Sequence, residues 1–328
     1  DEGTFASIST DQYVDIIPDS SRYRFVNWTT ADMSEISDPN SPSTTVLIDK
    51  AKMVTANYVV QYKVSFDQTG LDDTAIGTIV TVDGNSKTFT DLPFIFWADE
   101  GTVVSYSYES IISSSIADKR FVLVDVSGPA SPFTVTSSIS VVGNYKTQFR
   151  ITFDQTGIGG DYAGTVINID GTDYGVGDLP VSFWWDENSA HNFEFYSPLV
   201  VSTDKRYIWV STSGLSTQQS GTLTVTSSGD IVGNYATQYK VVFDHTGLDS
   251  TATGTVVTVN GSPKTFSDLP FEMWVNESTT ITYSYENLVS STTPDKRFYL
   301  TSITGPASPF TVTASVTITG NYIIQYKI

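Results

Sequence analysis

NYVVQYKVSFDQTG, residues 57–70, is the stretch that decides the fold. Between residues 60 and 66 apolar side chains alternate one by one with polar ones: Val60, Tyr62, Val64 and Phe66 against Gln61, Lys63 and Ser65. A period of two is the pattern of a β-strand that packs one face on a core. Asp67 and Gly70 then introduce turn-forming residue types. The stretch therefore predicts a core strand that ends in a turn.

The same stretch recurs along the chain. It reads NYKTQFRITFDQTG at 144–157, NYATQYKVVFDHTG at 234–247 and NYIIQYKI at 321–328. The asparagines that open the four copies are 87, 90 and 87 residues apart. Repeats of this length correspond to one small domain each, in tandem. We expect modules at residues 59–145, 146–235 and 236–322, preceded by an incomplete module at 1–58 and followed by a strand at 323–328.

Other parts of each repeat also indicate β-structure. Asp83-Gly84 and Asn260-Gly261 each follow a short β-branched run, and such dipeptides favour two-residue hairpins. No stretch shows the 3.6-residue period of an amphipathic helix. The predicted fold class is all-β, with tandem immunoglobulin-like β-sandwich modules of antiparallel strands in a linear array.

Residues 21–58 differ from the later repeats. They run from Tyr23-Arg24-Phe25 and Trp28 through a loop rich in Ser, Asp and Pro to a segment ending in Val54-Thr55-Ala56-Asn57-Tyr58. This arrangement resembles the divergent internalin-type B-repeat family. The resemblance implies a bacterial or archaeal cell-surface protein, because such repeats serve as spacers, adhesin stalks and coat components there.

Composition excludes several classes of partner and chemistry. The chain of 328 residues carries a net charge of −19, so nucleic acid is a poor partner and so is an anionic lipid surface. It has no cysteine, which excludes disulfides and thiol chemistry. No apolar run reaches the length of about 18 residues that a membrane span needs. An acidic surface suits a crowded extracellular coat.

The last strand has no module after it in the sequence. Its two faces consist of Ile324, Tyr326 and Ile328 on one side and Ile323, Gln325 and Lys327 on the other. At the other end, Asp1-Glu2-Gly3-Thr4 matches Asp99-Glu100-Gly101-Thr102, which lies in the middle of a repeat. We expect donor-strand complementation, in which this strand enters the incomplete N-terminal module of the next subunit and produces an open homopolymer. The other interpretation is a segment of a longer polypeptide, whose next module takes up the strand.

Catalysis is not expected. The only histidines, His191 and His245, occupy non-equivalent positions, and we expect no Ser-His-Asp or metal-binding pattern from them. Paired carboxylates such as Asp99 and Glu100 recur in the repeats at the same turn, and a role repeated in every module is structural. The protein is therefore predicted not to be an enzyme.

Calcium is the one cofactor that the sequence suggests. Several aspartates follow the end of each core strand, and Ca²⁺ is bound by several oxygen atoms at once. The candidate ligands are Asp67, Asp72, Asp73, Asp154, Asp161, Asp244 and Asp249. The spacing matches no EF-hand, so a solvated acidic loop is the alternative.

Glycans are suggested by two features. The acceptor pattern for N-glycosylation occurs at Asn27, Asn260 and Asn276. The repeated tryptophans Trp28, Trp97, Trp185 and Trp274 are expected in the cores, whereas Trp184 and Trp209 occur only in the third repeat and are better candidates for a surface contact.

These observations predict a structural subunit of an extracellular filament, sheath or surface layer (S-layer), a glycoprotein on the surface of an archaeal or bacterial cell. Its partners would be copies of itself. The alternative is an adhesin stalk that binds glycans or partner cells through its third module.

Overall fold

The chain is all-β in this computed structural model, which describes residues 3–328 and confirms the predicted class. Its only helices in that range are short 3₁₀ turns, and none is long and apolar enough to cross a membrane. The 3₁₀ turns are η1 (Met33–Glu35), η2 (Phe89–Asp91), η3 (Val176–Asp178) and η4 (Phe266–Asp268).

The chain divides into two compact units, and β15 and β18 each contribute residues to both. Unit 1 comprises residues 1–149 with 185–187 and 226–228, and unit 2 comprises 150–184, 188–225 and 229–328. The strands up to residue 156 are β1 (Thr4–Ser9), β2 (Tyr13–Ile17), β3 (Ser21–Thr29), β4 (Ser43–Ile48), β5 (Thr55–Thr69), β6 (Ala75–Ile76), β7 (Val80–Val82), β8 (Asn85–Lys87), β9 (Phe94–Asp99), β10 (Val103–Val104), β11 (Tyr106–Tyr108), β12 (Ile111–Ser114), β13 (Lys119–Ser127), β14 (Phe133–Thr134) and β15 (Ile139–Thr156).

The remaining strands follow in chain order. They are β16 (Thr165–Ile169), β17 (Thr172–Gly175), β18 (Val181–Asp186), β19 (Ala190–Phe195), β20 (Leu199–Val200), β21 (Lys205–Gly214), β22 (Ser220–Thr224), β23 (Gly229–Thr246), β24 (Ala252–Thr253), β25 (Val257–Val259), β26 (Ser262–Lys264), β27 (Phe271–Asn276), β28 (Thr280–Ile281), β29 (Tyr283–Tyr285), β30 (Leu288–Ser291), β31 (Lys296–Thr304), β32 (Phe310–Thr311) and β33 (Val316–Tyr326).

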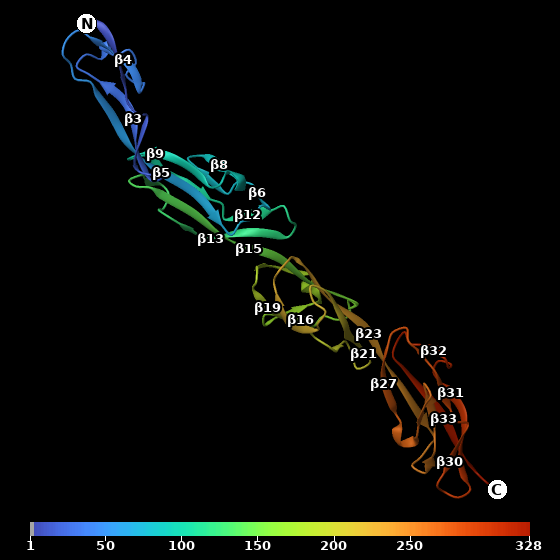
Figure 1. Cartoon of the computed structure of the whole chain (residues 1–328). Helices are drawn as coiled ribbons and strands as arrows, with labels where there is room; N and C mark the ends of the chain where they lie inside the picture. Colours follow the sequence, from blue (N-terminus) through green and yellow to red (C-terminus); the bar gives the residue numbers. More distant parts are fainter. Residues whose placement is uncertain (1–2) are drawn as a thin grey trace. The chain divides into compact units, whose positions relative to one another are not determined.

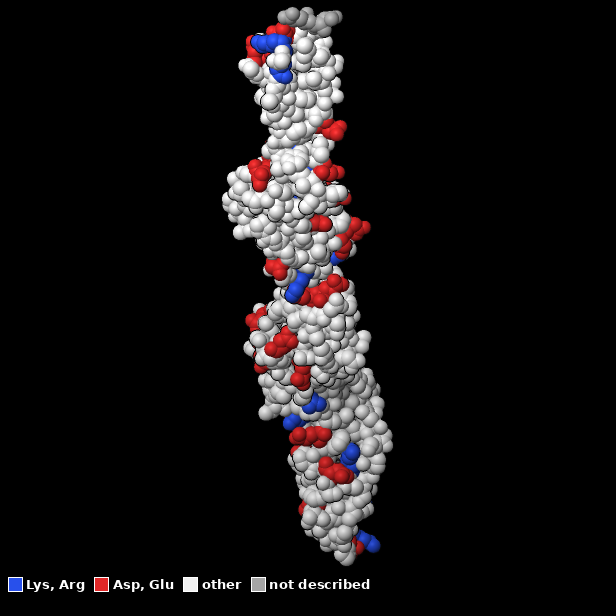
Figure 2. All heavy atoms as spheres, turned by 60° about the vertical axis from the view of Figure 1, so that its left-hand side comes forward, with Lys and Arg blue, Asp and Glu red and all other residues white. Residues whose placement is uncertain are grey.

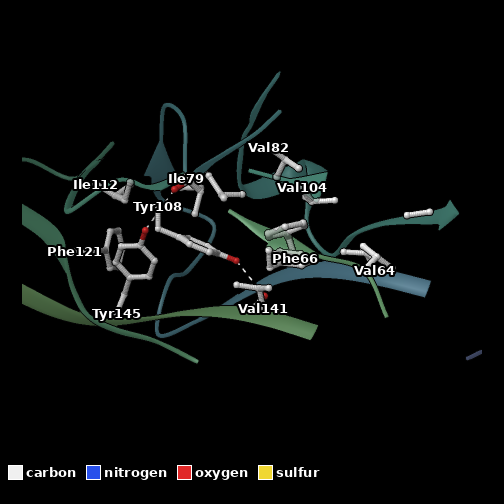
Figure 3. Close-up of a cluster of buried hydrophobic side chains, with 14 residues drawn as sticks. Val64, Phe66, Ile79, Val82, Val104, Tyr108, Ile112, Phe121, Val141 and Tyr145 are labelled. Atoms are coloured by element: carbon white, nitrogen blue, oxygen red, sulfur yellow. Dashed lines mark hydrogen bonds between the residues drawn. The ribbon is translucent and has the colours of Figure 1, made fainter. Parts of the chain in front are cut away.

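The described residues of unit 1 form two separate apolar clusters. The smaller one is formed by Phe25, Trp28, Ile36 and Val46. The larger one is built around Val64 and Phe66 of β5, and Figure 3 shows these side chains facing the strands that follow them in sequence. Both residues are fully buried, as the alternation in residues 57–70 predicts.

Unit 2 repeats the larger cluster. Val241 and Phe243 of β23 take the places of Val64 and Phe66, and they pack with Phe298, Ile318 and other apolar side chains. The module boundaries and the immunoglobulin-like arrangement remain predictions.

The long strands β5, β15, β23 and β33 pair with one another in parallel. In unit 1, residues 64–69 of β5 run beside 139–144 of β15 (Figure 1), and in unit 2, 241–246 of β23 run beside 316–321 of β33. The expectation of purely antiparallel sandwiches is therefore wrong. Parallel pairing follows because each long strand opens one repeat and the next long strand closes it in the same direction.

The predicted hairpins are present. Asp83 and Gly84 have φ values of 45° and 79°, and they connect β7 to β8. Positive φ at both central positions is the type I′ geometry that matches the twist of the flanking strands. Asn260 and Gly261, at 45° and 78°, do the same between β25 and β26.

The Thr-Gly turn at the end of each core strand packs against the next Asn-Tyr motif. Thr69 Oγ1 donates a hydrogen bond to Asn144 Oδ1 (2.7 Å), and a Cβ on Gly70 would lie 2.0 Å from the backbone oxygen of Tyr145. The turn repeats at Gly157 against Tyr235 and at Gly247 against Tyr322. This contact explains why both motifs recur together.

We predict that Gly70→Ala destabilises unit 1 much more than Gly101→Ala. Both glycines have similar positive φ, 82° and 85°, but a Cβ at Gly101 meets nothing within 4 Å. Gly101→Ala should cost about 1–2 kcal/mol of unfolding free energy for the backbone conformation alone. Gly70→Ala should cost at least about 3 kcal/mol because the Cβ also overlaps Tyr145. Equal losses in denaturant unfolding would contradict this close packing.

Candidate functional site

The residues that recur most regularly outside the cores form a contact where one repeat meets the next. We call it the junction clamp: an arginine, a glutamine on the long strand, and an aspartate or asparagine. In unit 1, Arg22 Nε donates to Gln61 Oε1 (2.9 Å), and Gln61 Nε2 donates to Asp99 Oδ1 (2.7 Å). Gln61 is only 7% exposed, so both hydrogen bonds are largely shielded from water.

Strand register places the three residues together. Arg22 of β3 lies opposite Gln61 of β5, and Gln61 lies opposite Asp99 of β9. Residues directly opposite each other on neighbouring strands present their side chains on the same face. The clamp therefore crosses three strands, of which β3 precedes the long strand in sequence and β9 follows it.

A tryptophan completes the clamp. The guanidinium carbon of Arg22 lies 4.2 Å from the ring centre of Trp97, a distance typical of cation–π contacts. Trp97 is half-buried and lies opposite Lys63, on the face away from Val64 and Phe66. The expectation that the repeated tryptophans are core residues is thus wrong for Trp97 and correct for Trp28, which is 7% exposed.

Two further clamps have the same geometry. Within unit 1, Arg120 donates to Gln148 (2.9 Å), which donates to Asp186 (2.9 Å). Within unit 2, the corresponding distances are 2.8 Å for Arg206 to Gln238 and 2.9 Å for Gln238 to Asn276. The Arg206 guanidinium carbon also lies 4.3 Å from the Trp274 ring.

A negative charge on the acceptor is not a shared feature of the clamps. Hydrogen bonds from Arg24, at 2.6 and 3.2 Å, hold the pKa of the Asp99 carboxyl below its usual value, and the bond from Gln61 adds to this effect. Asn276 takes the same place in unit 2 without a charge. What recurs is the arginine–glutamine pair and an oxygen acceptor opposite it. Sequence reasoning missed this set, although the fixed spacing of the arginines and glutamines could have revealed it.

Within residues 3–328, the predicted joining strand 323–328 is paired along one edge only, with β31. Ile323, Ile324, Gln325 and Tyr326 end β33 and lie opposite residues 296–299 of β31. Lys327 N also donates to the backbone oxygen of Asp295 (2.9 Å). Its apolar side chains are exposed to different degrees, 43% for Ile324 and 65% for Tyr326, and Ile328 is fully exposed.

The acidic residues proposed for calcium do not converge. Among residues 3–328 no group of three or more Asp, Glu, His or Cys side chains is arranged to hold a metal. Asp72, Asp161 and Asp249 each accept from a lysine, namely Lys119, Lys205 and Lys296, at 2.5, 2.6 and 2.5 Å. The other candidates divide into Asp67, Asp154 and Asp244, which each accept from the next backbone N–H, and Asp73, which is exposed. The expected convergence of oxygen ligands is therefore wrong for the described residues, and calcium binding stays an untested prediction.

The three glycosylation acceptors differ in exposure. Asn260 and Asn276 are exposed, and their Oδ1 atoms accept from Thr282 N (2.9 Å) and from Gln238. Asn27 is half-buried on β3 and accepts from Asn57 Nδ2 (3.0 Å). Glycosylation at these sites stays a prediction. Trp209, a candidate glycan contact, is half-buried and donates to Thr212 Oγ1 (3.0 Å).

The third repeat does bring a serine, a histidine and an aspartate together. His191 Nδ1 lies 2.6 Å from Asp170 Oδ2, and its Nε2 lies 2.9 Å from Ser189 Oγ. The expectation that the histidines form no Ser-His-Asp arrangement is therefore wrong, because these three side chains lie within hydrogen-bond distance of one another. Asp170 also accepts from Asn192 N (2.8 Å) at its hairpin, just as Asp83 accepts from Ser105 N (2.8 Å). The hairpin therefore accounts for the position of Asp170.

Comparison with known proteins gives distant structural similarity only. No protein family and no curated protein matches the sequence. Among solved structures, the pilus adhesin SpaC from Lactobacillus rhamnosus GG is 12% identical over 99% of this chain and 56% of its own, with a TM-score of 0.23. A streptococcal ancillary pilin is 11% identical over 79% of this chain and 99% of its own, with a TM-score of 0.17. The chain spans just over half the length of SpaC, and similarity this low leaves function to be inferred from the chain's own residues.

Removing the polar atoms of Gln61 should loosen the first clamp. In Gln61→Met, Arg22 and Asp99 each lose a shielded hydrogen bond, so we expect a loss of about 1–3 kcal/mol of unfolding free energy. Gln218 is exposed, and Gln218→Met should change the free energy by no more than about 0.5 kcal/mol. Denaturant unfolding of the full chain measures both, and indistinguishable values would show that the clamp contributes nothing.

The ion pair of Asp249 predicts a pH dependence. Hydrogen bonds from Lys296 and Thr251 lower the pKa of this carboxyl from 3.8 to about 2. Because the folded pKa lies below the unfolded one, the stabilisation is complete above pH about 4 and is lost as the pH falls toward 2. The difference in thermal midpoint between the unmodified protein and Asp249→Asn should therefore shrink over that interval. A difference that stays constant would contradict the pairing.

Proposed function

We propose that the protein is a structural component of an extracellular filament, sheath or surface layer, in which repeats follow one another head to tail. The finer proposal is that residues 323–328 of one subunit join the N-terminal module of the next. The internalin-type resemblance at residues 21–58 agrees with a cell-surface location and is part of the same proposal.

The exposure of Ile328 is the observation that carries the proposal. Its counterparts in the earlier long strands, Val64, Ile151 and Val241, are all 0% exposed because each is covered by its own repeat. Ile328 continues the same pattern and is covered by nothing in residues 3–328. Burial of an isoleucine side chain stabilises by roughly 1.5–3 kcal/mol, which favours uptake of the strand by another module.

The N-terminal module offers an apolar face of the right kind. Val14 and Tyr23 occupy the positions of Ile112 and Phe121, and they lie opposite each other on β2 and β3. Ile112 and Phe121 are 2% and 0% exposed, whereas Val14 and Tyr23 are 41% and 44% exposed. With Tyr58, these two side chains line an apolar hollow of about 290 Å³.

The surface agrees with an exposed coat protein. Acidic side chains are scattered over the face shown in Figure 2, and basic side chains are fewer there. A net charge of −19 keeps such a surface soluble and works against non-specific association. Association must then come from particular contacts such as strand pairing.

A mixing experiment tests head-to-tail joining. Ile328→Asp should block the donor end, and Val14→Asp should block the acceptor face, because each places a charge where burial is required. Each variant alone should remain monomeric in sedimentation and electron microscopy, and an equimolar mixture should form dimers through the one intact joint. Both residues are exposed in the single chain, so folding should be unaffected.

Val200→Asp is the matched control, because Val200 is 62% exposed and lies away from both ends of the chain. It should assemble like the unmodified protein. Filaments formed by Ile328→Asp alone, or an unmodified protein that stays monomeric at all concentrations, would contradict the proposal.

A further inference from the structure

A lysine lies shielded between two carboxyl groups in the N-terminal module. Lys52 Nζ is 2.7 Å from Glu35 Oε2 and 2.7 Å from Asp49 Oδ1. The side chains of Lys52 and Glu35 are only 6% and 8% exposed, whereas that of Asp49 is 37% exposed. These three residues belong to no junction clamp, and the proposed function does not use them.

Three segments of the module bring these side chains together. Glu35 ends η1, Asp49 directly follows β4, and Lys52 lies in the turn that leads into β5. Ile36 and Val46 pair with each other in an isolated antiparallel bridge, and both are buried in the small apolar cluster of this module. Their packing holds the end of η1 beside β4, so the short distances between the three side chains are fixed by the core.

The contacts of Lys52 are not hydrogen bonds. Among residues 3–328, Lys52 Nζ and Asp49 Oδ1 are buried atoms without a hydrogen-bond partner. Lys119 is shielded to a similar degree, at 9%, but its Nζ donates to Asp72 (2.5 Å) and to Thr74 Oγ1 (3.3 Å). A buried ammonium group without hydrogen bonds is unfavourable. The amine of Lys52 is therefore held in contact with carboxyl groups in an arrangement that an ordinary ion pair does not explain.

We propose that Lys52 and Glu35 form an intramolecular amide bond, with Asp49 as the group that transfers protons. Exposure distinguishes the roles of the two carboxyl groups. An amide between Lys52 and Glu35 removes a pair of shielded charges, whose desolvation is costly. Asp49 is the more exposed of the two carboxyl groups, so it can exchange protons with solvent. The inference goes beyond the proposed function and does not depend on head-to-tail joining.

The bond forms with the loss of one water molecule and needs no further reactant. Burial lowers the pKa of the Lys52 ammonium group, but the attraction of Asp49 and Glu35 outweighs burial and holds this pKa above its ordinary value, so the amine begins protonated. Lys52 first transfers a proton to Glu35, and the neutral amine then attacks Glu35 Cδ. Asp49 takes a second proton from the nitrogen and gives it to the departing hydroxyl group, which leaves as water. Groups fixed in contact react as if they were at very high concentration, which supplies the rate.

The amide bond braces a module with a small core. Four buried apolar residues form its cluster, against fourteen in the cluster around Val64 and Phe66. The chain has no cysteine, so a disulfide cannot supply a covalent link. A bond from Glu35 to Lys52 closes the segment between them into a loop, and such a link stabilises a fold mainly by restricting the unfolded chain.

Mass spectrometry of the denatured full chain tests the bond. The mass should be lower than that of the sequence by one water molecule, and fragment ions should place the link between Glu35 and Lys52. Lys52→Arg should restore the full mass, because a guanidinium group stays protonated and cannot attack the carboxyl group. Lys50→Arg is the matched control: Lys50 Nζ lies 3.8 Å from Glu35 Oε1, its side chain is 66% exposed, and the water loss should remain.

The variants also separate the amide from other losses of water. A succinimide at Asp83-Gly84 would remove one water molecule too, but it would persist in Lys52→Arg. Asp49→Ala should lower the initial rate of linking after cell-free synthesis by at least about tenfold, since it removes the proton transfer. A full mass for the chain without substitutions, a water loss that persists in Lys52→Arg, or a link located at Asp49 would overturn the proposal. An unchanged rate in Asp49→Ala would overturn the role given to Asp49.

Discussion

The long strands β5, β15 and β23 each belong to two consecutive repeats, and the rest of the structure depends on this sharing. In unit 2, residues 229–234 of β23 pair with β15, residues 231–239 with β21, and residues 238–243 with β27. The same strand therefore pairs with strands of one repeat along its first half and with strands of the next repeat along its second half. Backbone hydrogen bonds therefore continue along β23 from one repeat into the next.

The recurring sequence motifs follow from that constraint. The Asn-Tyr motif lies at the midpoint of the shared strand, where Asn144 receives the Thr-Gly turn and Tyr145 enters the core beside Tyr108. Gly143 is required there because a Cβ would lie 2.5 Å from the Tyr108 ring. Beyond the midpoint, the glutamine of the junction clamp binds an arginine from the strand that precedes it in sequence and an acceptor from a strand that follows it. Each motif therefore acts at a different point along one strand.

The all-β class, the hairpins and the core strands could be predicted from sequence because they depend on local alternation and turn chemistry. Val64 and Phe66 are examples. The parallel pairing of β5 with β15 could not be predicted from sequence, because it depends on contacts between strands that are about one repeat apart in the chain. The prediction that Trp97 is a core residue failed for a related reason. Trp97 lies opposite Lys63, and this pairing determines which face of the sheet its side chain occupies. Asp72, Asp161 and Asp249 looked like metal ligands because the lysines that pair with them lie 44 to 47 residues away in sequence.

Under the proposed function, the shared strands would carry load, and the functional contacts would lie at the junctions between repeats rather than in a pocket. Amide hydrogen exchange tests the shared strand most directly. The account predicts that amides of residues 235–240 in β23 exchange as slowly as those of core residues 241–243, because the ladder is continuous across the junction. Fast exchange at residues 235–240, as in a flexible linker, would contradict it.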